Sequence, residues 1–207
     1  EVIISVDCGI TAIEAADVAR QRGIDLIITD HHQPRSDGKL PRCAAIVHPA
    51  LDGEPGTPLA GVGVAFTLAR SLARAWGGAA VVTDRLRQRL NALVPLVAIG
   101  TVADLVPLVE DNRRLVRSGA AALSNAADPG LAALVRAAGL SGERAIGSGD
   151  IAFRIAPLLN AAGRLAHASA GADLLTHLDG PAAETTAQHL ATLNRDRQAA
   201  QKEIVEQ

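Results

Sequence analysis

The chain has 207 residues, of which 48% are hydrophobic, and its formal net charge is −2 at pH 7. This length allows one large domain or a domain with an appendage, and no apolar run reaches the about 20 residues that a membrane-spanning helix needs. The charge excludes a basic surface spread over the whole chain, and an aromatic content of 1% argues against a base-stacking surface for single-stranded nucleic acid, although a local basic groove stays open.

Two apolar runs near the N-terminus flank a helical segment. Val2–Val6 and Ile24–Thr29 are typical of strands, and Thr11-Ala12-Ile13-Glu14 between them fits a capping box at a helix start. Gly23 supplies the stop of that helix. A strand, a helix and a strand in so short a stretch predict two parallel strands joined by a right-handed crossover.

Polar side chains follow both of these strands directly. Asp7 comes after the first strand, and Asp30-His31-His32 comes after the second. Because the carboxyl ends of parallel strands meet at one edge of a sheet, and open parallel sheets bind ligands at that edge, we expect these side chains to converge on a site. The triplet by itself is equally well explained as a polar turn with two solvated histidines. Its pairing with Asp7 at the same edge of the sheet favours a functional site.

The rest of the chain is mainly helical in pattern. Ala44–Val47 predicts a third strand, which His48-Pro49 ends. We predict helices over 61–76, 84–105 (with Pro95 as a kink or restart), 113–123 (capped by Asn112), 131–138 and from Pro181 onward. The expected fold class is therefore α/β: a parallel sheet with helices on both faces, followed by a mainly helical region and a connecting helix.

The composition at the ends suggests a segment of a longer protein. Glu1 opens almost directly into a strand, methionine is absent, and the last helix has no stop signal at Gln207. Cys8 and Cys43 are too few for a disulfide framework, so we expect a reducing, cytoplasmic compartment. We interpret Cys8 as a small buried residue at a strand end.

Asp104 is the only charged residue in the stretch 97–108. An isolated buried carboxylate costs several kcal/mol, and a cation is the simplest compensation, although a helix-end aspartate bonded to backbone explains it too. Together with Asp7 and His31, Asp104 makes a mixed oxygen and nitrogen donor set. Such a set suits Mn²⁺ or Mg²⁺ better than the thiolate sites that zinc often uses.

Several motifs, in order, carry a resemblance to a known family. The segments 6–11 (VDCGIT), 29–32 (TDHH), 59–66 (LAGVGVAF) and 99–108 (IGTVADLVPL) resemble the DHH phosphoesterase superfamily. Asn112-Arg113 and 160–165 (NAAGRL) are similar to its RecJ branch of bacterial single-stranded-DNA-specific exonucleases. The resemblance implies that residues 1–180 form an N-terminally truncated DHH domain and that 181–207 begin a long interdomain helix.

The resemblance also implies a two-metal phosphodiesterase that uses Mn²⁺ or Mg²⁺ to activate water and to stabilise the attacking and leaving oxygens. Asp7 would bridge the two ions, and His31 and Asp104 would complete the shell of one of them. His32 would face the substrate phosphate, and Asp30 would orient the histidines.

Other residues are less sharply assigned. Arg154, Asn160 and Arg164 are candidates for a DNA path, with internal salt bridges as the competing explanation, and Arg113 is a further candidate or a surface arginine. Gly61 and Gly63 allow either a close approach to phosphate or close helix packing. His48 stands where the family usually has asparagine.

The implied activity is 5′→3′ exonuclease action on single-stranded DNA in repair and recombination, with single-strand-binding protein and a helicase as further partners and no membrane. The family's Asp-x-Asp motif has no equivalent in residues 1–207, so we expect this piece alone to bind one divalent ion weakly and to have little nuclease activity. The alternatives are another DHH hydrolase, acting on oligoribonucleotides, cyclic dinucleotides or pyrophosphate, and a non-catalytic replication factor with the DHH fold.

Overall fold

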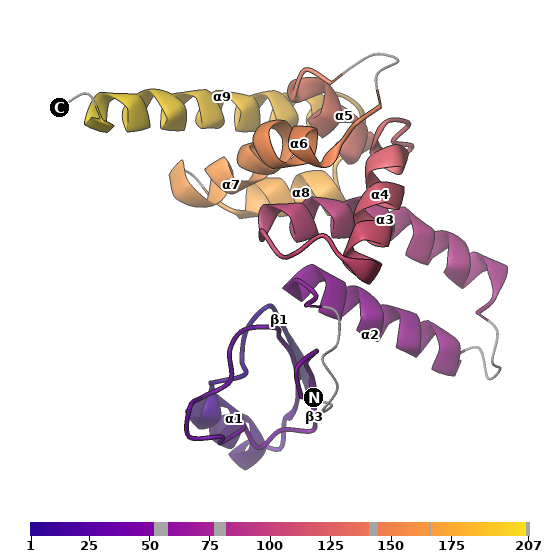
Figure 1. Cartoon of the computed structure of the whole chain (residues 1–207), viewed down its shortest axis with the longest axis vertical. Coiled ribbons are helices and arrows are strands. Elements are labelled where there is room, and N and C mark those ends of the chain that lie inside the picture. The colour runs from indigo at the N-terminus through magenta and orange to yellow at the C-terminus, as the bar shows by residue number, and fades with distance from the viewer. Residues whose placement is uncertain (52–57, 77–81, 141–144, 166, 206–207) are drawn as a thin grey trace. The chain divides into compact units, whose positions relative to one another are not determined.

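The computed structural model describes residues 1–51, 58–76, 82–140, 145–165 and 167–205 (Figure 1). The chain divides into two compact units, Glu1–Leu115 and Val116–Gln207. None of the helices in the described ranges is long and apolar enough to cross a membrane.

The first unit contains a parallel sheet of three strands in the order β1-β2-β3. The strands are β1 (Val2–Val6), β2 (Asp25–Thr29) and β3 (Ala45–Val47). Val6 pairs with Thr29, and Thr29 pairs with Val47, so all three strands end at the same edge of the sheet. The predicted parallel pairing and the shared edge are therefore confirmed.

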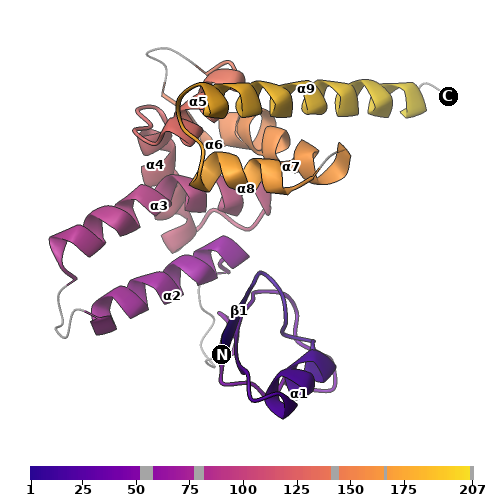
Figure 2. The ribbon, with the colours of Figure 1, turned by 180° about the vertical axis from the view of Figure 1, so that it is seen from behind.

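Helix α1 (Ile13–Gln21) connects β1 to β2, and it lies on the other side of the strands from α2 (Gly61–Trp76) (Figure 2). The predicted capping box is wrong, because Ala12 occupies the N-cap position and no side chain makes a cap hydrogen bond there. Gly23 ends the helical segment as predicted. Its φ of +66° lies in the left-handed region, which glycine adopts without a steric penalty.

Helix α3 (Asp84–Ala103) packs against α2, and glycine makes the approach close. A Cβ on Gly100 would lie 2.7 Å from Cγ1 of Val62. Pro95 is buried inside α3 without dividing it. The helix ends before the predicted residue 105, because Leu105 has a left-handed φ of +59°.

Helix α4 (Glu110–Leu123) starts earlier than the sequence predicted. Asn112 lies in its first turn and is not its cap. The buried amide of Asn112 instead donates from Nδ2 to the carbonyl oxygens of Pro58 and Pro107, each at 2.9 Å. Asn112 thus ties the segment before α2 to the segment after α3, a contact that local sequence patterns do not reveal.

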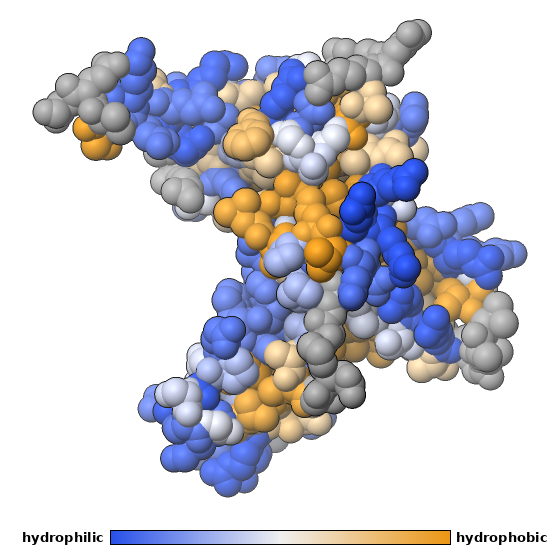
Figure 3. Space-filling view, viewed as in Figure 1, coloured by the Kyte–Doolittle hydropathy of each residue, from blue (hydrophilic) through white to orange (hydrophobic). Residues whose placement is uncertain are grey.

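The second unit is helical in its described residues. It consists of the end of α4 from Val116 onward, α5 (Pro129–Ala137), α6 (Ser148–Asp150), the π-helical turn η1 (Ile151–Ile155), α7 (Ala156–Leu165), α8 (Ser169–Thr176) and α9 (Gly180–Val205). Helix α9 packs against α5, α7 and α8, with Ala183, Ala187 and Leu190 buried. The surface of α9 toward its C-terminal end is mostly hydrophilic (Figure 3). The predicted α/β class with a mainly helical region after the sheet is confirmed.

Candidate metal centre

Three side chains from separate elements meet around one imidazole nitrogen. Nε2 of His31, just after β2, lies 3.0 Å from Oδ1 of Asp7, just after β1. The same nitrogen lies 3.4 Å from Oδ2 of Asp104, the C-cap residue of α3. The convergence predicted from strand topology is therefore present, and packing of α3 brings in the third donor.

This nitrogen lacks the hydrogen bond that a buried polar atom normally has. Nε2 of His31 is buried and makes no hydrogen bond within the described residues. Buried polar atoms are nearly always hydrogen-bonded, so an orphaned one calls for an explanation. A divalent cation ligated by Nε2 and flanked by two carboxylates supplies one, and the mixed donor set suits Mn²⁺ or Mg²⁺.

The side chain of His32 lies close to the donors Asp7 and His31, whereas the sequence predicted only that it faces the substrate phosphate. One ligand atom each of Asp7, His31 and His32 lie within 4.8 Å of one another. The two imidazole rings are 4.5 Å apart between centroids and tilted by 50°. The adjacency of His31 and His32 was the only sequence signal for this, and it does not determine which way the second ring turns.

Asp30 organises the loop that carries both histidines. Its side chain is almost fully buried, with the residue 1% exposed. Oδ1 accepts hydrogen bonds from the backbone N–H of His31 at 2.7 Å, from the backbone N–H of His32 at 3.2 Å and from Nδ1 of His32 at 2.7 Å. Oδ2 accepts from the backbone N–H of Ile10 at 2.9 Å.

These contacts shift the pKa of both partners. Burial acts to raise the pKa of Asp30, but the hydrogen bonds from Ile10, His32 and His31 outweigh it and lower the pKa to about 2. The hydrogen bond to Asp30 raises the pKa of His32 above its ordinary value of 6.5. Asp30 is thus a carboxylate whose charge orients its neighbours, while Asp7 and Asp104 face His31.

Asp7 owes its position to an unusual backbone conformation and to a glycine. Its φ is +63°, a left-handed value that aspartate tolerates better than most residues, and its N–H donates to the Thr29 carbonyl at 2.9 Å. A Cβ on Gly61, at the start of α2, would lie 2.2 Å from Oδ1 of Asp7. This contact gives Gly61 a packing role against the Asp7 side chain rather than against another helix.

The candidate DNA-contacting residues are distributed over both units. Arg113 is exposed on α4 in the first unit, and Asn160 is exposed on α7 in the second. Arg154 has internal partners, because Nη2 donates to the Gly139 carbonyl at 2.7 Å and Nη1 lies 3.6 Å from Oδ1 of Asp150. Arg164 belongs to α7, and its side chain lies outside the described residues.

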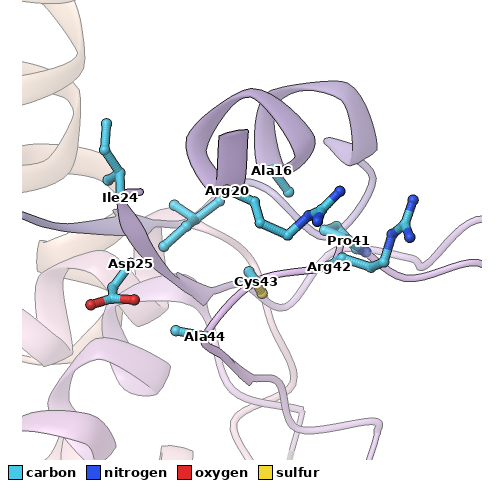
Figure 4. A pocket seen from close by; sticks show the side chains of 9 residues that line it. Ala16, Arg20, Ile24, Asp25, Pro41, Arg42, Cys43 and Ala44 are labelled. Carbon is cyan, nitrogen blue, oxygen red and sulfur yellow. The ribbon is translucent and has the colours of Figure 1, made fainter. Parts of the chain in front are cut away.

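Neither cysteine belongs to the donor set. Cys8 is exposed, so its interpretation as a buried residue is wrong. Cys43 lines a cavity of about 420 Å³ at the amino ends of β2 and β3, the edge of the sheet opposite His31 (Figure 4). Arg20 and Arg42 border this cavity, and each has a guanidinium nitrogen within 3.7 Å of Oδ1 of Asp17, which offsets part of their charge.

Comparison with known proteins finds a family match for the first part of the chain. Residues 1–101 match the family model "DHH family, N-terminal domain". These residues are therefore similar to the N-terminal domain of DHH-family proteins. The DHH triplet for which the family is named is Asp30-His31-His32 in this chain, and it lies at the carboxyl end of β2.

The similarity to single proteins extends over nearly the whole chain. The chain is 41% identical over 201 residues to the single-stranded-DNA-specific exonuclease RecJ of Bacillus subtilis, and the match covers 95% of this chain and 23% of that protein. It is 35% identical over 210 residues to the RecJ of Thermus thermophilus, covering 99% of this chain and 28% of that protein. The chain thus spans only about a quarter of the length of these curated relatives.

Solved structures of RecJ proteins have the same fold. A crystal structure of exonuclease RecJ bound to manganese matches with a TM-score of 0.85 at 33% identity, covering 99% of this chain and 49% of that one. RecJ of Thermus thermophilus in complex with Mg²⁺ matches with a TM-score of 0.74 at 30% identity, covering 100% of this chain and 27% of that one.

Replacing Gly61 with alanine should weaken Mn²⁺ binding. The new methyl group would lie 2.2 Å from Oδ1 of Asp7 and must push that carboxylate away from His31. We expect a loss in affinity on the order of ten- to a hundredfold, as for other residues that orient ligands, measured by isothermal titration calorimetry. Gly149→Ala is the matched control, since its Cβ would meet nothing within 4 Å. Equal affinity of both variants would contradict the packing role of Gly61.

The His32 imidazole should titrate above pH 6.5, and Asp30→Asn should lower that pKa toward the ordinary value. The hydrogen bond to Asp30 stabilises the imidazolium, so its contribution to folding is full below pH 6.5 and disappears as the pH rises through the raised pKa. The contribution of Asp30 is present above its ordinary pKa of 3.8 and disappears as the pH falls toward about 2. Histidine ring NMR signals measure the shift, and an unchanged His32 pKa in the variant would be inconsistent with the contact.

Proposed function

We propose that the protein to which this chain belongs is a 5′→3′ exonuclease that hydrolyses phosphodiester bonds of single-stranded DNA. The observation that carries the proposal is the orphaned Nε2 of His31 between Asp7 and Asp104. It occurs in a chain that is 41% identical over 201 residues to a protein named for this activity.

In this proposal Asp7, His31 and Asp104 hold a divalent cation, Mn²⁺ or Mg²⁺, and Asp7 is also available to a second ion. The names of the similar crystal structures include both metals, which supports the choice. When bound, such ions supply positive charge that stabilises the negative charge developing on a phosphoryl group.

His32 acts on the substrate phosphate in this proposal. Its Nδ1 donates to Asp30, and the side chain is 59% exposed, so in the imidazolium form Nε2 also carries a proton and can donate to an anionic oxygen. The raised pKa increases the fraction of imidazolium near neutral pH, the form that makes this charge-assisted hydrogen bond. Asp30 keeps the ring in this orientation and does not itself contact substrate.

The path of the DNA strand is proposed to include Arg113, Arg154, Asn160 and Arg164. Arg154 keeps 40% of its side chain exposed despite its internal partners, which supports a role in binding phosphate. We further propose a DHH domain over 1–180 and an interdomain helix from 181, a cytoplasmic location, a role in repair and recombination, and single-strand-binding protein and a helicase as partners.

The alternatives raised by the sequence are less well supported. A non-catalytic replication factor has no need of the donor geometry around His31. The similar proteins bear the name of a single-stranded-DNA-specific exonuclease rather than that of a dinucleotide or pyrophosphate hydrolase.

The direct test uses a protein that contains this chain and has the full length of its relatives, and it compares the rates at which two substrates are cleaved. With Mn²⁺ present, 5′-labelled single-stranded DNA should be shortened from its 5′ end faster than dinucleotides are cleaved. His31→Ala should lower the rate roughly a hundredfold or more, since metal charge stabilisation is worth several kcal/mol. Asp84→Asn is the control, because that side chain is 91% exposed. Rapid turnover of dinucleotides with long DNA untouched would refute the assignment.

A further inference from the structure

A buried histidine stands beside the site without a part in the proposed chemistry. His48 follows β3 directly and is only 5% exposed. Its Nε2 lies 2.8 Å from the carbonyl oxygen of His32. Its Nδ1 lies 3.1 Å from the backbone nitrogen of Ala50.

The two contacts assign the roles of both ring nitrogens. The Ala50 N–H can only donate, so Nδ1 accepts with its lone pair. The His32 carbonyl can only accept, so Nε2 carries the proton and donates. One imidazole thus joins the loop after β2 to the turn after β3, and both of its nitrogens are satisfied.

The hydrogen bond from His48 to the His32 carbonyl helps to hold the backbone of His31 and His32 in place. Asp30 accepts from the N–H groups of His31 and His32, which fixes the loop from one side. His48 holds the carbonyl of His32, which fixes it from the other side. The direction of the His31 ring, whose side chain is 13% exposed, depends on this backbone.

The same bond holds together two walls of a cavity beside His31. The cavity has a volume of about 210 Å³, and its lining includes His31, Gln33, Pro49 and Ala50. Gln33 follows the carbonyl that His48 binds, while Pro49 and Ala50 form the turn that its Nδ1 anchors. Loss of the bond would let these walls separate next to the donor set.

We propose that His48 is a positioning residue that sets the His31-His32 backbone, and thereby the metal donors, through its hydrogen bond to the His32 carbonyl. The inference rests on the proposed function, because it assumes that His31 binds a divalent ion. It assigns no contact with substrate or metal to His48 itself.

Two substitutions of His48 distinguish the effect of its hydrogen bond from the effect of the volume that its side chain fills. His48→Gln places an amide nitrogen as many bonds from Cβ as Nε2, so it can still donate to the His32 carbonyl. His48→Leu fills a similar volume with an apolar side chain and removes both polar contacts. His189→Leu, at an exposed position of α9, controls for the exchange of histidine for leucine.

The chain and its variants are titrated with Mn²⁺, and binding is followed by electron paramagnetic resonance, with melting temperatures measured in parallel. We expect His48→Gln and His189→Leu to bind within about threefold of the parent, and His48→Leu to bind on the order of ten- to a hundredfold more weakly. Ring NMR signals of His31 should move in His48→Leu and stay in His48→Gln. If His48→Leu does not fold, His48→Phe takes its place as a planar ring without hydrogen-bonding groups.

The outcomes distinguish this inference from the proposed function. Equal Mn²⁺ affinity in parent and His48→Leu, or equal losses in His48→Leu and His48→Gln, would overturn the positioning role. If the affinities differ as expected while the full-length protein leaves single-stranded DNA intact, His48 keeps its role and the proposed exonuclease activity fails.

Discussion

The structure around the carboxyl edge of the sheet depends on one buried imidazole nitrogen that has carboxylates beside it and no hydrogen bond to any described residue. Nε2 of His31 lies 3.0 Å from Asp7 and 3.4 Å from Asp104, two residues that come from different elements. A buried polar atom without a partner is costly, and two carboxylates held together repel each other. A divalent cation would remove both costs at once, and the oxygen and nitrogen donors around this nitrogen fit such an ion.

The surrounding residues divide the work of building this geometry. Asp30 is a buried carboxylate whose four hydrogen bonds from N–H groups offset its desolvation, so it can remain ionised without a cation. Asp7 and Asp104 accept no such hydrogen bonds from the described residues, and each has an oxygen close to Nε2 of His31. Gly61 leaves the space that the carboxylate of Asp7 occupies. Two aspartates that follow adjacent strands thus serve different purposes, because backbone amides surround only one of them.

The sequence alone could predict those parts of the site that follow from strand topology. Parallel strands end at one edge, so Asp7 and His31 had to lie close together, and a lone carboxylate in apolar sequence singled out Asp104. The role of Gly61 and the Asn112 bonds depends on where α2 and α3 pack, which no local pattern encodes. The capping box at Thr11 failed for a local reason, since the helix begins one residue later than the motif requires.

The most direct test is X-ray diffraction from crystals of this chain grown with Mn²⁺, with data collected at the manganese absorption edge. We expect an anomalous peak within bonding distance of Nε2 of His31 and of carboxylate oxygens from Asp7 and Asp104. A peak elsewhere, or no peak while that nitrogen donates a hydrogen bond to a carboxylate, would contradict it.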